Sequence, residues 1–350
     1  MNSSMTSTGD GPRATRPSFA DVLSAAERLA GKAVVTPLLE SPALNAQVGG
    51  RVLIKPEVLQ RTGSFKFRGA YNRISMIPEA ARRSGVVAYS SGNHAQGVAA
   101  AAALLGVPAT IVMPADAPQI KIANTRGYGA TVELYERASE SREARAEQIA
   151  AETGATIVRP YDDPGIMAGQ GTCGLEIARQ AAQLNAPLDM LLVCCGGGGL
   201  TSGCAIAMAE LSPRTKVYAV EPEGFDDTRR SLEGGTRVAN EPGQQSFCDA
   251  LLSPTPGELT FSVNRELLAG GIAVSDAEVA AAMAFAFTTL KLVVEPGGAV
   301  CLAALLAGKV NARGKTLALT LSGGNVDPGT HAEAVAAGIA IIAEARPRLS

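Results

Sequence analysis

One stretch of the chain decides its fold: Leu191-Leu192-Val193-Cys194-Cys195-Gly196-Gly197-Gly198-Gly199-Leu200-Thr201-Ser202-Gly203. Its first four residues are all apolar, which is typical of a central strand in a parallel sheet covered by helices on both faces. Four consecutive glycines let the backbone curl until several N–H groups point at one anion, and the N-terminus of the following helix adds partial positive charge. The spacing fits neither a dinucleotide fingerprint nor a Walker A loop. We therefore predict a strand–turn–helix unit that binds a single phosphate group.

The same alternation of short β-branched runs and longer alanine-rich segments continues along the chain from about Ser18. The expected strands are Val52–Lys55, Val86–Ser90, Thr110–Met113, Thr131–Leu134, Leu191–Cys194, Val217–Glu221 and Leu317–Leu321. The expected helices are Phe19–Ala30, Ala95–Leu105, Glu140–Thr153, Ile166–Leu184, Leu200–Leu211, Asp276–Leu290, Gly298–Leu306 and His331–Ala345. This alternation predicts an α/β fold with open, twisted, mostly parallel sheets flanked by helices.

The pattern also suggests two domains. Residues 81–162 contain strand–helix units of their own and are predicted to form a small domain, inserted into a large domain of residues 18–80 and 163–350. Glycine-rich turns follow several strand ends, at 91–92, 196–199 and 323–324, and ligands of open α/β sheets bind beyond such ends. We expect one active site, assembled from distant segments in the cleft between the domains.

Composition and charge limit the classes of molecule that this chain is expected to bind. The 350 residues carry a formal net charge of −2 and no basic stripe, which argues against nucleic acid and anionic membranes. Residues 1–17 are predicted to be a disordered tail without a secretory signal, and no apolar stretch reaches the length of a membrane span. The six cysteines lack CxxC spacing and are expected to be buried free thiols in a reducing, cytoplasmic compartment. Two histidines are too few for a histidine-built zinc site.

A second stretch carries reactive chemistry: Gly63-Ser64-Phe65-Lys66-Phe67-Arg68-Gly69-Ala70. An apolar collar of two phenylalanines disfavours the charged form of Lys66, so its pKa should fall. A lysine that is partly neutral near pH 7 can attack a carbonyl and form a Schiff base. Taken alone, the octapeptide is equally compatible with a surface lysine on a loop.

Four motifs in this order resemble the serine/threonine dehydratase and serine racemase family of pyridoxal-phosphate enzymes, which have the tryptophan synthase β-like fold. The motifs are Gly63-Ser64-Phe65-Lys66, Ser90-Ser91-Gly92-Asn93-His94, Gly196-Gly197-Gly198-Gly199 and Ser322-Gly323-Gly324-Asn325. The resemblance covers nearly the whole chain after the N-terminal tail. It implies pyridoxal 5'-phosphate as cofactor and a fold of two sheets with the active site between a large and a small domain.

The resemblance also implies roles for individual residues. For the cofactor these are Lys66 as the Schiff-base lysine, Phe65 beside the ring, Asn93 on the 3-hydroxyl, Gly196, Gly197, Gly198 and Gly199 around the phosphate, and Ser322 at the pyridine nitrogen. A neutral hydroxyl at that nitrogen does not force its protonation, which favours loss of a β-leaving group over transamination. Lys66 would also be the general base that removes the Cα proton.

Substrate contacts follow in the same way. The turn of Ser90, Ser91, Gly92, Asn93 and His94 would bind the substrate carboxylate through backbone N–H groups, and Ser91 matches the residue that serves racemases as a second acid/base. Arg142 and Ser253 fall where racemase relatives contact the substrate. Arg142 would pair with a second carboxylate, as in 3-hydroxyaspartate, or would be a solvated helix charge. Near Ser253 the chain has Ala250 where relatives often have glycine, which leaves the shape of the pocket open.

A cation site is implied by Glu221, Phe225 and Asp227. Relatives bind a divalent cation through a Glu, a backbone carbonyl four residues on and an Asp six residues on. The acidic density of the segment suits Mg²⁺ or Ca²⁺ with oxygen ligands, in a structural or activating role. An exposed acidic loop is the alternative.

The expected reaction is β-elimination from a β-hydroxy amino acid, which yields a 2-oxo acid and ammonia. Threonine, serine, 3-hydroxyaspartate and phenylserine all remain open as substrates. The alternatives are an amino-acid racemase, a cysteine-synthase-like β-replacement enzyme, and a catalytically silent ligand-binding module. Relatives suggest a homodimer. The short segment after Ser322–Asn325 leaves no room for a C-terminal regulatory domain, which favours a catabolic enzyme.

Overall fold

A computed structural model describes residues 15–117, 119–136 and 139–345 of the chain. Its larger sheet has six strands in the order β1 (Leu39–Glu40), β2 (Arg51–Pro56), β10 (Thr316–Leu321), β7 (Met190–Cys194), β8 (Lys216–Pro222) and β9 (Gly270–Val274). All neighbouring pairs are parallel except β1 with β2. The apolar strand β7 lies between β10 and β8 with every residue buried, as its sequence predicts.

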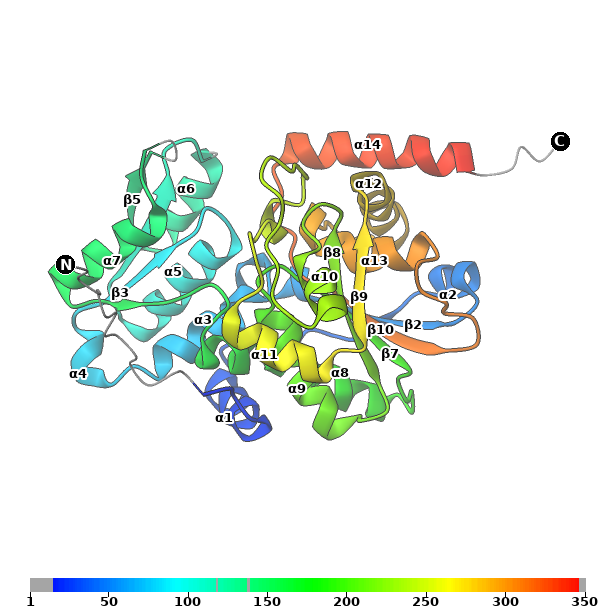
Figure 1. Cartoon of the computed structure of the whole chain (residues 1–350), viewed down its shortest axis with the longest axis horizontal. Helices are drawn as coiled ribbons and strands as arrows, with labels where there is room; N and C mark the ends of the chain where they lie inside the picture. Colours follow the sequence, from blue (N-terminus) through cyan, green and yellow to red (C-terminus); the bar gives the residue numbers. More distant parts are fainter. Residues whose placement is uncertain (1–14, 118, 137–138, 346–350) are drawn as a thin grey trace, which may run out of the picture.

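The smaller sheet is all parallel and lies to one side of the larger one (Figure 1). Its order is β5 (Thr131–Tyr135), β4 (Ala109–Pro114), β3 (Val86–Tyr89) and β6 (Thr156–Ile157). These four strands come from one continuous part of the chain, whereas the strands of the larger sheet come from before and after it. This arrangement supports two domains, and the predicted boundaries near residues 81 and 162 remain predictions.

Helices flank both sheets (Figure 1). In chain order they are α1 (Phe19–Leu29), α2 (Pro42–Val48), α3 (Lys66–Ser75), α4 (Glu79–Arg82), α5 (Asn93–Leu105), α6 (Gln119–Gly127), α7 (Arg142–Thr153), α8 (Pro164–Gln183), α9 (Gly199–Leu211), α10 (Asp227–Gly234), α11 (Glu258–Leu267), α12 (Asp276–Phe285), α13 (Pro296–Leu306) and α14 (Pro328–Ala345). Short helical turns are η1 (Glu57–Leu59), η2 (Arg61–Gly63), η3 (Asp249–Leu251) and the π-helical η4 (Ala286–Leu290). Helix α3 packs against α5 and α8, and so bridges the two sheets.

The sequence-based assignments agree with the structure for every expected strand and differ at some helices. Helix α3 was not predicted, because its buried residues include the polar Arg68 and Asn72, which obscure an apolar stripe. The helix expected over 276–290 ends as α12 at Phe285 and continues as the π-helical turn η4, which stops where Lys291 adopts a left-handed conformation with φ of 60°.

A buried cluster of charges fixes α3 to the larger sheet. Arg68 Nε donates to Glu57 Oε2 at 2.7 Å and its Nη1 donates to Glu176 Oε1 at 2.6 Å. Lys55 Nζ, at the end of β2, donates to Glu176 Oε2 at 2.7 Å. Burial alone would lower the pKa of Arg68, but Glu57 and Glu176 raise it above its ordinary value. Because α3 begins at Lys66, this cluster positions the candidate Schiff-base lysine.

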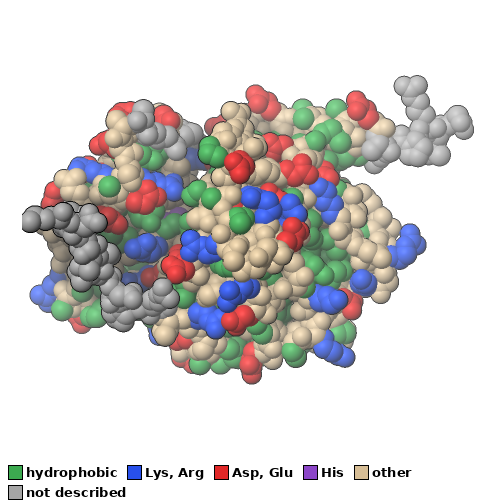
Figure 2. Space-filling view, viewed as in Figure 1, with side chains coloured by type: hydrophobic (Ala, Val, Ile, Leu, Met, Phe, Trp, Pro, Cys, Tyr) green, Lys and Arg blue, Asp and Glu red, His purple; other side chains and the backbone are tan. Residues whose placement is uncertain are grey.

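The surface agrees with a chain of nearly balanced charge. Figure 2 shows acidic and basic side chains interspersed over the visible face, without a field of one sign. Within the described ranges, no helix is both long enough and apolar enough to span a bilayer. The six cysteines are free and buried, as expected.

Candidate active site

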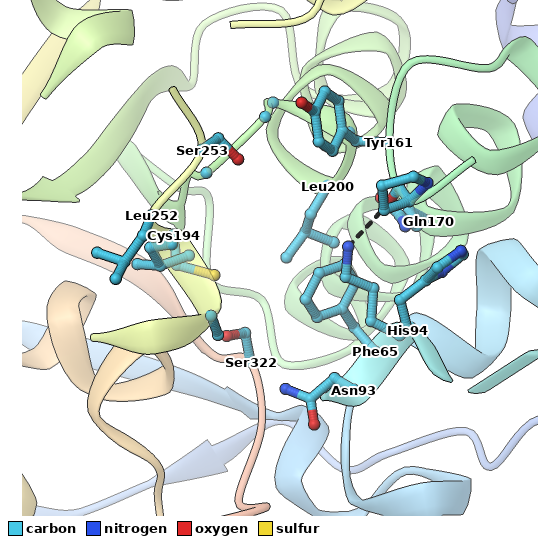
Figure 3. A pocket seen from close by; sticks show the side chains of 18 of the residues that line it. Phe65, Asn93, His94, Tyr161, Gln170, Cys194, Leu200, Leu252, Ser253 and Ser322 are labelled. Atoms are coloured by element: carbon cyan, nitrogen blue, oxygen red, sulfur yellow. Dashed lines mark hydrogen bonds between the residues drawn. The ribbon is translucent and has the colours of Figure 1, made fainter. Parts of the chain in front are cut away.

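A single cavity gathers the residues that the sequence assigns to the cofactor, at the carboxyl ends of the parallel strands (Figure 3). Each of them lines its wall: Phe65, Lys66, Asn93, Gly196, Gly197, Gly198, Gly199 and Ser322. They come from four separate segments, at the starts of α3 and α5 and after β7 and β10. The geometry is therefore that of one site, and the individual roles remain predictions.

Lys66 is the first residue of α3, and its amine points into the cavity. Its Nζ donates to the carbonyl oxygen of Pro160 at 2.8 Å and lies 5.2 Å from the centroid of the Phe65 ring. Burial lowers the pKa of Lys66 to about 8, against smaller opposing effects of Cys194 and Glu295. About a tenth of the amine is thus neutral at pH 7, and the neutral form is the one that attacks a carbonyl or accepts a proton.

The glycine turn after β7 has a shape that side chains would prevent. Gly198 has φ of 91°. A Cβ there would lie 2.9 Å from each of two side-chain atoms, Asn264 Nδ2 and Thr260 Oγ1. A Cβ at Gly197 would collide with the ring of Tyr161. Gly198 is also the N-cap of α9 and offers no side-chain acceptor to the first N–H groups of the helix. The turn therefore has the form and polarity of an anion cradle, which fits the phosphate of the predicted cofactor.

Four helices around the cavity begin without a side-chain cap at their N-terminus. The N-cap residues of α3, α5, α9 and α13 make no side-chain cap hydrogen bond, and residues at each of these N-termini line the cavity. By contrast, α7, α8 and α12 are capped by Ser141, Asp163 and Ser275. The partial positive ends of four helix dipoles thus favour anionic ligands in this cavity.

Asn93 is held by Asn325, from the fourth motif, and by Glu295, which the sequence did not single out. Its Nδ2 donates to Glu295 Oε1 at 2.5 Å, and its Oδ1 accepts from Asn325 Nδ2 at 2.7 Å. Burial raises the pKa of Glu295 to about 8. With Oδ1 occupied and one N–H used, Asn93 retains one N–H for an oxygen acceptor in the cavity, as its predicted contact with the cofactor 3-hydroxyl requires.

Ser322 lies on the same wall and is 3% exposed. The Phe65 N–H donates to the Ser322 carbonyl at 3.1 Å, so the two motifs that flank the cavity are joined through the backbone. Burial raises the pKa of the neighbouring Cys194 thiol to about 11, while hydrogen bonding to Ser322 and Thr320 opposes this rise. The thiol is therefore neutral near pH 7 and places no charge beside the Ser322 hydroxyl.

The predicted substrate contacts are divided. Asn93, His94, Arg142 and Ser253 line the cavity, whereas Ser90, Ser91 and Gly92 are not part of its wall. The Gly92 N–H donates to Ser90 Oγ at 3.2 Å, so at least this backbone donor already has an acceptor. His94 Nε2 lies 2.9 Å from the Val158 carbonyl, and burial lowers the pKa of His94 to about 3. His94 is therefore neutral, with Nδ1 as an acceptor.

Arg142 begins α7 and reaches the cavity from the smaller sheet. Its Nε donates to Glu143 Oε1 at 2.7 Å, and its guanidinium lies 5.7 Å from the centroid of the Tyr89 ring. Ala250 also lines the wall, close to Ser253. A cation and a hydroxyl thus lie in the wall of the same cavity as Lys66.

The candidate cation ligands lie elsewhere, at the end of β8. Glu221 accepts from the N–H groups of Thr228 and Arg229 at 2.9 and 2.8 Å, so its carboxylate caps α10. Asp227 Oδ1 accepts from Asn240 Nδ2 at 2.7 Å, and its Oδ2 is buried without a partner. Burial, and to a smaller extent the nearby Asp227, raise the pKa of Glu221 to about 8.

Several lining residues were missed from the sequence: Tyr89, Pro160, Tyr161, Gln170, Cys194 and Glu295. Cys194 could have been suspected, because it ends the strand two residues before the glycine turn, whereas the only local signal at Glu295 is the Pro296 that follows it. Tyr161 lies in an irregular segment between β6 and α8 and carries no local signal.

Comparison with known proteins agrees with this geometry. The family model described as "Pyridoxal-phosphate dependent enzyme" matches residues 30–323. An L-threo-3-hydroxyaspartate ammonia-lyase from Pseudomonas sp is 47% identical over 89% of this chain and 96% of its own length. A serine racemase from Schizosaccharomyces pombe is 42% identical over 89% and 95%. The crystal structure of a threonine deaminase from T.th. superposes with a TM-score of 0.84 at 44% identity, over 89% of this chain and 99% of that one.

These matches confirm the predicted fold and family, and the names of the relatives agree with the predicted class of reaction, β-elimination from a hydroxy amino acid. The chain belongs to the pyridoxal-phosphate dependent enzymes, in the group that contains serine racemases, threonine dehydratases and 3-hydroxyaspartate ammonia-lyases.

Proposed function

We propose that this chain is an ammonia-lyase that acts on a β-hydroxy amino acid with a second carboxylate, of which 3-hydroxyaspartate is the simplest. The products are a 2-oxo dicarboxylate and ammonia. The observation that carries the proposal is the position of Arg142 in the wall of the cavity that contains Lys66. A guanidinium binds a carboxylate through paired charge-assisted hydrogen bonds, which neither serine nor threonine can use at their side chains.

The residues fit the cofactor of the family. Lys66 would hold pyridoxal phosphate covalently, the glycine turn would hold its phosphate, and Asn93 and Ser322 would contact its ring. When bound, the cofactor supplies an electron-withdrawing group that weakens the Cα–H bond of the substrate. The substrate amine would displace Lys66 from the cofactor, and the freed Nζ, whose pKa is lowered to about 8, would accept the Cα proton as general base. The β-hydroxyl leaves with a proton as water. After the product is released, hydrolysis of its C=N bond consumes one water and releases ammonia.

A substrate panel tests the proposal. Formation of 2-oxo acid is measured with D- and L-serine and with the separate D and L, threo and erythro forms of 3-hydroxyaspartate, threonine and phenylserine. We expect the highest kcat/KM for one isomer of 3-hydroxyaspartate. The variant Arg142→Met should lower that kcat/KM by about 10- to 100-fold, the value of one or two charge-assisted hydrogen bonds, and should change the value for serine far less.

The matched control is Arg145→Met, on the same helix α7. Arg145 pairs with Glu133 at 3.5 Å and does not line the cavity, so its loss should leave both substrates unaffected. A preference for threonine, or an equal loss for both substrates in Arg142→Met, would contradict a dicarboxylate substrate.

Racemisation is the second candidate activity, supported by the 42% identical serine racemase. It would require Ser91, the predicted second acid/base, to reach the substrate, although Ser91 is not part of the cavity wall. Chiral analysis of the substrate left after partial turnover tests it: the opposite enantiomer accumulates if racemisation accompanies elimination. A β-replacement activity would in turn depend on an added thiol acceptor.

A divalent cation at Glu221, Asp227 and the Phe225 carbonyl is a further part of the proposal. The unpartnered Asp227 Oδ2 and the proximity of two buried carboxylates support it. Throughout the described part of the chain, no three His, Cys, Asp or Glu side chains are grouped to hold a metal, so this site would depend on two carboxylates and a backbone oxygen. Mg²⁺ or Ca²⁺ would neutralise their repulsion.

Assembly and location complete the proposal. A homodimer is expected from the relatives and a cytoplasmic location from the sequence. Light scattering on the purified protein tests the first, and fractionation of cells that express the full chain tests the second.

A further inference from the structure

The crossover that leads from β6 to α8, residues 160–163, contacts several separate parts of the active site. The Pro160 carbonyl accepts from Lys66 Nζ at 2.8 Å. Asp163 caps α8 through Oδ1, and its Oδ2 accepts from Arg73 Nε, on the lysine helix α3, at 2.9 Å. The segment is thus tied to α3 at both of its ends.

Asp162 connects the crossover to the glycine turn through the start of α11. Its carboxylate accepts from the N–H groups at the start of α11, at 2.9 Å from Leu259 and 3.0 Å from Thr260. The Thr260 hydroxyl in turn donates to the carbonyl of Gly197 at 2.7 Å. The peptide that carries the Gly197 carbonyl is therefore held on one side by a side chain that Asp162 positions.

Tyr161 also contacts this glycine. A Cβ built on Gly197 would overlap three carbons of the Tyr161 ring. The ring therefore packs directly on the glycine and leaves no space for a side chain. A Cβ on Gly199 would lie 3.0 Å from the Tyr161 Cβ. Figure 3 shows the ring at the edge of the cavity, on the side of Ser253.

We propose that Tyr161 is a positioning residue, whose ring holds the glycine turn in the conformation that binds the cofactor phosphate. Consecutive glycines have more backbone freedom than any other residues, so a free turn would lose much entropy when its N–H groups converge on one anion. The packing of the Tyr161 ring and the hydrogen bond from Thr260 restrict the turn before the phosphate arrives. This inference rests on the cofactor of the family and is independent of which amino acid is the substrate.

The hydroxyl of Tyr161 is separate from this role. Burial raises the pKa of the phenol, and the Ser253 side chain beside it opposes that rise. The hydroxyl lies on the side of Ser253, a predicted substrate contact, whereas the ring packs on Gly197, so removal of the hydroxyl and removal of the ring should have different effects.

The experiment compares pyridoxal phosphate with pyridoxal, which lacks the phosphate. The holoenzyme is stripped of cofactor and titrated with each compound, with absorbance as the readout. Tyr161→Leu should weaken pyridoxal phosphate binding about tenfold or more, the value of one hydrogen bond to a charged group, and should change pyridoxal binding less than about twofold. Tyr161→Phe keeps the ring and should bind both compounds like the wild type.

The matched control is Tyr218→Leu, because Tyr218 also packs on a glycine, 3.7 Å from a Cβ built on Gly270, away from the cavity. It should bind both compounds unchanged. Tyr161→Met is measured in parallel, so that a folded variant without the flat ring is obtained even if the Leu variant fails to fold. Unchanged pyridoxal phosphate affinity in either folded variant, or an equal loss for both compounds, would overturn the assignment.

Discussion

The side chains of Asn93 and Glu295, 202 residues apart in the sequence, are joined by a 2.5 Å hydrogen bond in the wall of the active site. Asn93 is 8% exposed and Glu295 is 3% exposed. A carboxyl group in such surroundings is protonated more easily than in water, and its pKa is raised from 4.5 to about 8. The folded chain therefore binds a proton at Glu295 that the unfolded chain releases near pH 4.5.

The first prediction concerns the pH dependence of stability. Because the folded-state pKa is raised, the stabilising contribution of Glu295 is complete below about pH 4.5 and is lost as the pH rises towards about 8. The slope is at most about 1.4 kcal/mol per pH unit. Glu295→Gln should flatten the slope between pH 5 and 8, measured by urea unfolding of cofactor-free protein. Some slope should remain, because burial also raises the pKa of Glu221 to about 8. An unchanged slope would contradict the buried, protonated carboxyl.

The second prediction concerns Lys66. Lys66→Ala should abolish turnover and covalent attachment of the cofactor together, with attachment measured as a borohydride-stable mass increase on the peptide that contains residue 66. Lys32→Ala, whose side chain lies on the surface, is the control and should retain both. Turnover without attachment would show that Lys66 is not the anchor.

A third prediction addresses the buried charge cluster beneath α3. Arg68→Met leaves Glu57 buried without its main partner and should lower the free energy of unfolding by about 3–5 kcal/mol. Arg51→Met breaks the exposed pair with Glu40 and should cost no more than about 1 kcal/mol. Urea unfolding measures both. Equal effects would mean that the buried cluster does not hold α3.

A fourth prediction concerns the cation. If Glu221 and Asp227 bind Mg²⁺ or Ca²⁺, the melting temperature of the wild type should rise with added cation, and Asp227→Asn should abolish the rise. Asp276→Asn, an acidic residue at the start of α12, serves as the control. A wild-type melting temperature that does not respond to either cation would exclude the site.

The fold could be predicted from the sequence where a signal is local. Every expected strand is present, because β-branched runs between glycine or polar residues mark buried parallel strands. The strands β1 and β6 have only two residues each, too few for a pattern, and β9 begins with two glycines. Helix α3 stayed hidden because its buried face carries Arg68 and Asn72, whose partners lie elsewhere in the chain.

The residues of the candidate site likewise fall into those with a local sequence signal and those without one. Cofactor motifs are contiguous, so Lys66 and the glycine turn could be found by inspection. Glu295 and Tyr161 gain their importance only from residues 202 and 36 positions away, to which no local spacing points. The turn at residues 90–92 shows the converse, since its sequence suggests a binding loop but its residues do not line this cavity, and its role stays a prediction.

The N-termini of α3, α5, α9 and α13, which have no side-chain cap, affect the stability of the folded protein and therefore its lifetime. Helix ends that lack an acceptor leave the empty fold less stable than it could be, and a bound anion supplies what is missing. A ligand at one hundred times its dissociation constant adds about 2.7 kcal/mol to the free energy of unfolding. The cofactor should therefore act as a folding ligand as well as a reagent, and the supply of pyridoxal phosphate should set the lifetime and abundance of this enzyme.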